Sequence, residues 1–221
     1  MLAYHNDAAI KAQYLARVKA HETADEIIHG RYWEHGKGCA VGCTIHSDSH
    51  AAYETELGVP RILARLEDRI FEGMVNGESK TFPRRFLEAI PVGADLSLVW
   101  PKFAVWLLTD PKDGVIHFTK KDSKQWIAIN RVADLYRELK DWDKRDKAAF
   151  KAAAADADAA YAAAYAAAAA AAAAAAYAAQ ILLNPKADAD AAADARRAAY
   201  KRQSEKLLEL LAGAQQDGRR G

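Results

Sequence analysis

Residues 147–179 read KAAFKAAAADADAAYAAAYAAAAAAAAAAAYAA, and this stretch decides the fold class. Alanine is the strongest helix former because its side chain loses no conformational entropy in a helix. The stretch contains no proline or glycine, so it predicts one long helix. At a rise of roughly 1.5 Å per residue, that helix would be about 50 Å long. Part of it must protrude from the rest of the chain or lie across it.

A second helix is predicted directly after the first. Asn184 and Pro185 suit the cap and the first turn of a new helix, which runs to about Ala212. Residues 144–221 therefore predict a long alanine-rich helical hairpin. Small side chains let helices pack closely, so we expect the hairpin to bind a protein partner or a second copy of the chain. The apolar face of the second helix repeats at helical spacing through Tyr200, Ser204, Leu207, Leu208 and Leu211.

The alanine-rich stretch is also long enough to be considered as a membrane span. Residues 159–183 carry no charge, and this length is sufficient to cross a bilayer. A buried methyl group contributes only about 0.8 kcal/mol of transfer free energy, and leucine-like residues occur only at the end of the stretch. We therefore expect no membrane span.

Residues 1–143 predict a multi-helix globular body, so the whole chain is expected to be all-α. Asn6 or Asp7 can cap a helix over residues 6–29. A short helix is expected to end near Gly58, and Pro60 suits the start of a helix over residues 61–73.

The later part of the body gives weaker signals. Pro101 favours a kink or a helix start within residues 96–108. The segment VIHFT, residues 115–119, is the one plausible strand, but without a partner strand it is more consistent with a helix or an extended loop. Asp122 or Ser123 can cap the last helix of the body.

The overall charge and cysteine content exclude some classes of function. The formal charge is +1, with 31 basic and 30 acidic residues, so no global field favours nucleic acid or an acidic membrane. The two cysteines are too few for a disulfide scaffold, and the start, MLAYHNDAAIKAQ, lacks the pattern of a signal peptide. We expect a cytoplasmic protein with reduced thiols.

Both cysteines and three of the seven histidines crowd residues 35–50. These residue types bind zinc or act as nucleophile and base. In a continuous helix they would share one stripe, but Cys39 and His50 would lie about 16 Å apart along the axis, too far for one ion. The pairs Cys43 with His46, or His46 with His50, remain feasible. The candidate zinc ligands are therefore His35, Cys43, His46 and His50.

The glycines in this segment leave its conformation open. If the helix is continuous, a feasible pair needs further ligands from elsewhere, such as His5, His21, His117 or a carboxylate. Alternatively, Gly36, Gly38 and Gly42 break the helix, Ser47 and Asp48 begin a new one, and the bent segment gathers more ligands.

Two further interpretations concern the thiols. Cys39 can stand at a helix N-terminus, where a thiol is activated, so Cys39, Cys43 and His46 are candidate catalytic residues. The alternative, which we favour, is that GCAVGC is a small-residue helix whose cysteines pack as small hydrophobic residues.

The segment from Tyr32 to Ser47, YWEHGKGCAVGCTIHS, together with AAYKRQSEKLLELL at residues 198–211, resembles a group of uncharacterised bacterial and phage-borne helical proteins. The resemblance implies a helical fold and a bacterial or mobile-element setting, and it transfers no catalytic residue. The leading functional prediction is a protein-binding or self-associating module, possible roles being host interaction or inhibition. The alternative is a thiol- or metal-dependent enzyme or sensor centred on the Cys39 to His50 segment.

Overall fold

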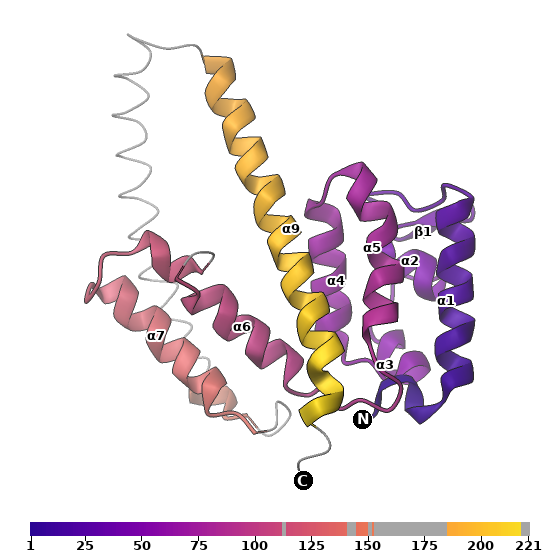
Figure 1. Ribbon diagram of the computed structural model, residues 1–221, viewed down its shortest axis with the longest axis horizontal. Coiled ribbons are helices and arrows are strands. Elements are labelled where there is room, and N and C mark those ends of the chain that lie inside the picture. Colours follow the sequence, from indigo (N-terminus) through magenta and orange to yellow (C-terminus); the bar gives the residue numbers. More distant parts are fainter. Residues whose placement is uncertain (112–113, 141–144, 150–151, 153–184, 218–221) are drawn as a thin grey trace. The chain divides into compact units, whose positions relative to one another are not determined.

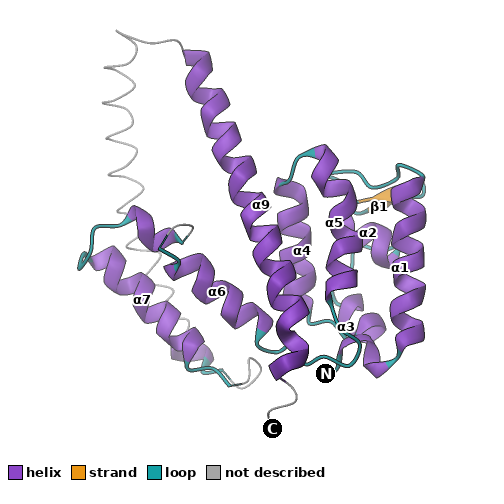
Figure 2. Cartoon of the chain, in the orientation of Figure 1, coloured by secondary structure: helices purple, strands orange, loops and turns teal. Residues whose placement is uncertain are grey.

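The computed structural model of the 221-residue chain describes residues 1–111, 114–140, 145–149, 152 and 185–217 (Figure 1). Helices dominate it, as the prediction of an all-α fold requires, and among the described residues the strands form one small two-stranded sheet (Figure 2). The chain divides into two compact units, residues 1–100 with 197–221, and residues 101–196.

Most of the predicted alanine-rich helix lies outside the described residues. Residues 147–149 are helical, and Asp146 accepts hydrogen bonds from the backbone N–H groups of Ala148 and Ala149 (2.9 and 3.0 Å). Residues 153–184 and the predicted boundary between residues 143 and 144 are not among the described residues. The hairpin and this domain boundary stay predictions.

The first unit begins with a short 3₁₀ helix, η1 (Ala3–Asn6), and helix α1 (Ala8–Thr23). Asp7 caps α1 by accepting a hydrogen bond from the N–H of Ala9 (2.7 Å), as predicted. The helix ends earlier than the predicted residue 29. The reason is tertiary: Asp25 has a φ of 59°, and the N–H of Ile28 pairs with the carbonyl of Gly38 (2.8 Å) instead of continuing the helix.

The next four helices after α1 lie in the first unit, and α2 is the most deeply buried of them. They are α2 (Ala40–Ile45), α3 (Ala52–Leu57), α4 (Arg61–Gly73) and α5 (Asn76–Ala89). Every residue of α2 is buried, and it contacts α1, α4 and α5. The predictions at Gly58 and Pro60 are confirmed, since Gly58 ends α3 with a φ of 62° and Pro60 directly precedes α4.

The C-terminal part of helix α9 (Pro185–Asp217) belongs to the first unit. Leu207, Leu211 and Ala214 are buried, and Lys201 forms an ion pair with Glu78 of α5 (2.8 Å). This part of the chain is therefore a core element and not a free arm.

The second unit contains most of α6 (Val99–Thr109), 3₁₀ helix η2 (Val115–Phe118), α7 (Lys124–Arg137) and the start of α9. Pro101 lies in the first turn of α6, and Ser123 caps α7 by accepting from the N–H of Trp126 (3.2 Å). Both observations agree with the predictions, and VIHF is helical and not a strand. Of the helices that the structure describes, none is long and apolar enough to span a membrane.

Candidate functional site

A β-hairpin occupies the start of the cysteine and histidine segment. Strands β1 (Trp33–Glu34) and β2 (Lys37–Gly38) are antiparallel. His35 and Gly36 form the two-residue turn with φ values of 50° and 79°, the left-handed pair that a tight hairpin needs. The side chain of His35 is 91% exposed at the tip, so this candidate metal ligand points away from the buried thiols.

The segment is bent between the hairpin and α2. Cys39 is the extended residue at the start of α2, and His46 ends the helix with a φ of 56°. The structure thus selects the glycine-broken conformation and not the continuous helix. Two glycines pack on one carbonyl: a Cβ on Gly38 or Gly42 would lie 2.0 or 1.4 Å from the oxygen of Tyr32.

Both thiols are buried, with Cys39 1% and Cys43 0% exposed, and neither forms a disulfide. Burial raises the pKa of Cys43 to about 12 and, with a smaller contribution from the charge of Asp68, raises the pKa of Cys39 well above its ordinary value. The Cys43 thiol donates to the carbonyl of Gly38 (3.3 Å). The protonated form is therefore strongly favoured at both positions. Buried, protonated thiols are consistent with the interpretation that the cysteines pack as small hydrophobic residues.

His46 lies in a different group from either thiol. Its Nε2 is 2.8 Å from Nε2 of His21, whose Nδ1 donates to Glu26 (2.6 Å). The indole of Trp33 stacks on the His46 ring, with centroids 4.2 Å apart. One of the two Nε2 atoms donates to the other, so the imidazoles of His21 and His46 form a hydrogen-bonded pair. His46 was a predicted catalytic and metal residue, and Glu26 was not anticipated.

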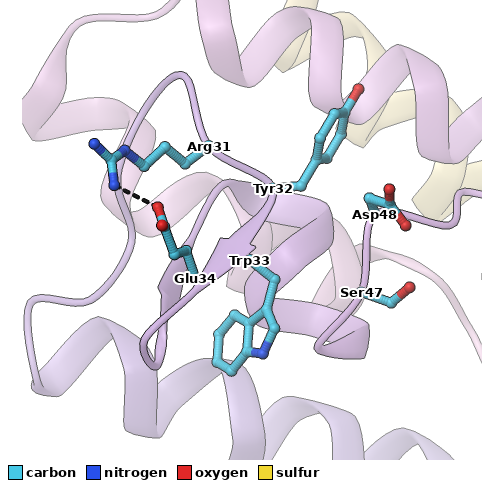
Figure 3. Close-up of a pocket in the computed structure, with 6 residues that line it drawn as sticks. All are labelled: Arg31, Tyr32, Trp33, Glu34, Ser47 and Asp48. Atoms are coloured by element: carbon cyan, nitrogen blue, oxygen red, sulfur yellow. Dashed lines mark hydrogen bonds and ion pairs between the residues drawn. The ribbon is translucent and has the colours of Figure 1, made fainter.

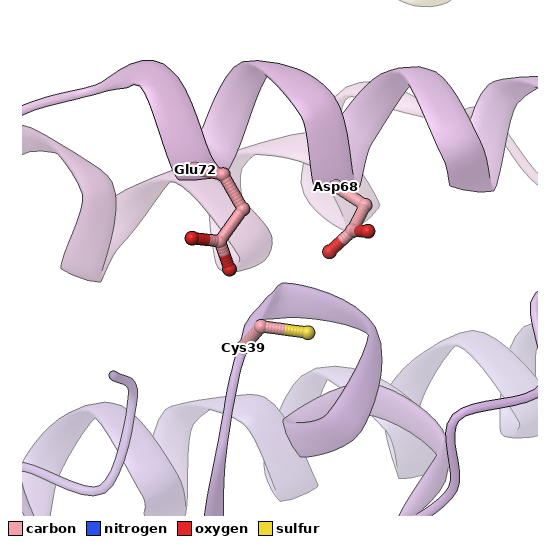
Figure 4. Close-up of side chains that lie close together, drawn as sticks. All are labelled: Cys39, Asp68 and Glu72. Atoms are coloured by element: carbon pink, nitrogen blue, oxygen red, sulfur yellow. The ribbon is translucent and has the colours of Figure 1, made fainter. Parts of the chain in front are cut away.

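His50 lies in another group, between α2 and α4. Its Nε2 donates to Oδ2 of Asp68 (3.3 Å). Cys39, Asp68 and Glu72 each place one potential ligand atom within 4.8 Å of the others. Figure 4 shows the two carboxylates descending from one helix toward the sulfur of Cys39. Of the sequence-predicted residues, the structure therefore brings Cys39 and His50 into one neighbourhood.

The remaining distant candidates are His5 and His117. The Nε2 of His5 donates to the carbonyl of Thr55 (3.1 Å), and His117 belongs to the second unit.

An open pocket of about 480 Å³ lies beside the hairpin. Figure 3 shows its lining residues, with an ion pair between Arg31 and Glu34 on one side and Ser47 and Asp48 on the other. Tyr32 is 44% exposed. The pocket is lined by Arg31, Tyr32, Trp33, Glu34, Ser47 and Asp48.

No family model, curated protein or solved structure matches the chain. The resemblance to uncharacterised bacterial and phage-borne proteins stays a prediction, and the functional inference depends on the geometry of the residues themselves.

Sequence reasoning missed the acidic residues of α4. Asp68 and Glu72 are four residues apart and so share a helix face, which is a signal of a paired site, but it is common on solvated helices. Glu67 was also missed, although it is fully buried. It accepts a hydrogen bond from the hydroxyl of Tyr53 (2.8 Å), and burial raises its pKa well above the usual range. The available signal was the position of this acidic residue among the apolar residues of the helix predicted over residues 61–73.

Proposed function

We propose that this protein is a protein-binding helical module whose contact surface includes the pocket beside the β1–β2 hairpin. The observation that carries the proposal is the sequence Arg31–Tyr32–Trp33 at an open pocket, where Arg31 and Tyr32 are exposed and Trp33 is half-buried. Arginine, tyrosine and tryptophan are the residue types most enriched at the energetic centres of protein interfaces.

The chemistry of the pocket supports a protein partner over an apolar small molecule. Charges of both signs line it, from Arg31 on one hand and Glu34 and Asp48 on the other. Apolar ligands favour pockets lined mainly by hydrophobic side chains, whereas a protein segment offers backbone and charged groups together. The rigid hairpin turn at His35 and Gly36 presents these residues with little conformational entropy to lose on binding.

Site-specific photo-crosslinking tests the proposal. A photoreactive residue in place of Glu34, in cells that naturally make the protein, should capture a partner that the same residue in place of Lys19 on α1 does not. With the purified partner, Tyr32→Ala should weaken binding about 30-fold, the effect of a 2 kcal/mol contact. Lys19→Ala should leave affinity unchanged. Equal capture at both positions, or equal affinity for Tyr32→Ala, would remove this surface from the proposal.

Self-association through the alanine-rich hairpin is the second part of the proposed function. Its support is compositional, together with the long helix α9, whose C-terminal part is anchored by buried Leu207 and Leu211. Charges placed on one face of the alanine run should block close helix packing while keeping helical propensity.

The test is the molar mass of the full chain by light scattering. The triple variant Ala166→Glu, Ala170→Glu and Ala173→Glu should be monomeric at concentrations where the unmodified chain is dimeric or larger. Ala198→Glu, on an exposed position of α9, is the control and should behave as the unmodified chain does. A monomeric unmodified chain at every concentration would exclude self-association.

The proposals about compartment and origin depend on the cysteines and on the suggested resemblance. Two free cysteines fit a cytoplasmic protein, and a host-directed or inhibitory role fits the suggested mobile-element origin. A thiol-dependent enzyme or sensor is less well supported, because a nucleophilic thiol needs solvent access and a lowered pKa.

A further inference from the structure

The cluster of Cys39, Asp68 and Glu72 joins two helices that are separate in sequence. Asp68 and Glu72 lie one turn apart on α4, and Cys39 is the residue that precedes α2. Their potential ligand atoms all lie within 4.8 Å of one another. Cys39 is 1% exposed, and Figure 4 shows it below the two carboxylates, which point toward it from one helix.

Neighbouring groups orient both carboxylates. His50 donates to Oδ2 of Asp68 (3.3 Å), while Oδ1 of Asp68 is buried and accepts no hydrogen bond from any described residue. Both oxygens of Glu72 lie 3.1 Å from the N–H of Gly30. Such outer partners are what fixes ligand geometry at metal sites. They leave the buried Oδ1 of Asp68 open to a further partner.

The charge of the cluster is uncompensated by basic side chains. Within the part of the chain that the structure describes, Asp68 forms an ion pair with His50, and neither it nor Glu72 pairs with a lysine or arginine. The negative charge of Asp68 also raises the pKa of the nearby Tyr32 phenol. A bound cation would offset the repulsion between two carboxylates held this close.

We propose that Cys39, Asp68 and Glu72 bind a zinc ion, with His50 holding Asp68 in position. Zinc accepts thiolate sulfur together with carboxylate oxygen, whereas magnesium and calcium select oxygen alone. Ligand atoms around one zinc lie about 3.3 to 3.8 Å apart, as metal–ligand bonds of about 2.0 to 2.3 Å require. The present separations, all within 4.8 Å, must therefore shorten by roughly 1 Å when the ion binds.

The ligand set predicts an open coordination position. Three protein ligands leave the fourth place of a tetrahedral ion for water or a ligand. Glu72 is exposed and the Asp68 side chain is 16% exposed, so this position faces the surface and gives the ion an entry path. The cysteine must lose its proton when the metal binds, and zinc uptake is therefore accompanied by proton release.

Cobalt and zinc titrations of the full, chelator-treated chain test the site. Cobalt should give an absorption band from thiolate-to-metal charge transfer, and zinc should bind at one ion per chain and raise the thermal midpoint. Cys39→Ala should remove the band and weaken zinc binding at least 100-fold. Cys43→Ala is the matched control, because it removes an equally buried thiol four residues away, and it should retain both properties.

Two further variants keep the test decisive if Cys39→Ala does not fold. Glu72→Gln changes an exposed ligand and should lower zinc affinity at least 100-fold in a folded chain. His50→Asn should lower it about 10- to 100-fold, as expected for an outer-shell partner. Absence of stoichiometric zinc in the unmodified chain would overturn the site, and so would loss of the cobalt band in Cys43→Ala with its retention in Cys39→Ala. The zinc proposal does not rest on the proposed function, and the titrations need no protein partner.

Discussion

The backbone at Gly42 lies against the carbonyl of Tyr32 so closely that a Cβ at position 42 would be 1.4 Å from that oxygen. The contact joins the middle of α2 to the chain just before the hairpin. Gly38 meets the same oxygen, at 2.0 Å from its ideal Cβ position. Because neither glycine has a Cβ, β2 and the buried helix α2 can both lie directly against this carbonyl.

Gly42→Ala should therefore destabilise the first unit by about 3 kcal/mol, because the neighbour is backbone and cannot rotate away. The free energy of unfolding from urea titration measures this. Gly77→Ala in α5 is the control, since no atom lies within 4 Å of its Cβ position. It should leave stability unchanged or raise it by up to about 1 kcal/mol. Similar values for the two variants would contradict the close contact.

Glu67→Gln should make the protein more stable at neutral pH. Burial raises the pKa of Glu67 above the unfolded value, so the native state keeps a proton that the unfolded state has lost. Stability from this group is therefore fully present below about pH 4.5 and is lost as the pH rises through the folded pKa.

The advantage of Glu67→Gln should consequently shrink on acidification. Urea midpoints at several pH values measure it, with the exposed variant Glu209→Gln as control. That control should stay within about 0.5 kcal/mol of the unmodified chain throughout. A difference for Glu67→Gln that is constant with pH would show that folding does not raise the pKa of Glu67.

His46→Asn should reduce the acid sensitivity of the fold. Burial, followed by the charges of Arg17 and His21, lowers the pKa of His46. The stability it contributes is therefore present above the unfolded pKa of about 6.5 and lost as the pH falls through the folded value. Unfolding midpoints between pH 7.5 and 5 should fall less steeply for the variant.

His35→Asn provides the matched control for that measurement. His35 and His46 both have left-handed backbone, with φ values of 50° and 56°, and asparagine tolerates this conformation. The two substitutions thus differ in the environment of the imidazole alone. Equal slopes for the two variants would remove the paired imidazoles as the source of acid sensitivity.

Leu211→Ala should cost about 2 to 5 kcal/mol, because the side chain is fully buried and its removal leaves a cavity. The neighbouring Leu210 is only partly buried, so Leu210→Ala should cost less than half as much. Thermal unfolding of both variants gives the comparison. A negligible effect of Leu211→Ala would mean that the C-terminal part of α9 is dispensable to the first unit.

Local signals in the sequence were sufficient for several helix starts. Asp7, Pro60 and Ser123 each mark a helix start that the structure contains. Such signals act within a single turn, through a capping hydrogen bond or a restricted φ angle, so neighbouring residues suffice to predict them.

The hairpin at residues 33–38 shows where local reasoning failed. Its strands are two residues long, too short for an alternating pattern to be recognised. The pair His35 and Gly36 was the available signal, because both residue types tolerate the left-handed conformation of the turn.

By itself, the sequence determined the helical class, the helix starts and the region in which cysteines and histidines concentrate. The tertiary structure alone decided their partners. In the folded chain His46 contacts His21, His50 contacts Asp68, and Glu72 lies beside Cys39. The physical reason is that a cap or a turn depends on adjacent residues, whereas a site on two helices depends on how those helices pack. Here Gly38 and Gly42, which have no Cβ, let β2 and α2 lie directly against the carbonyl of Tyr32.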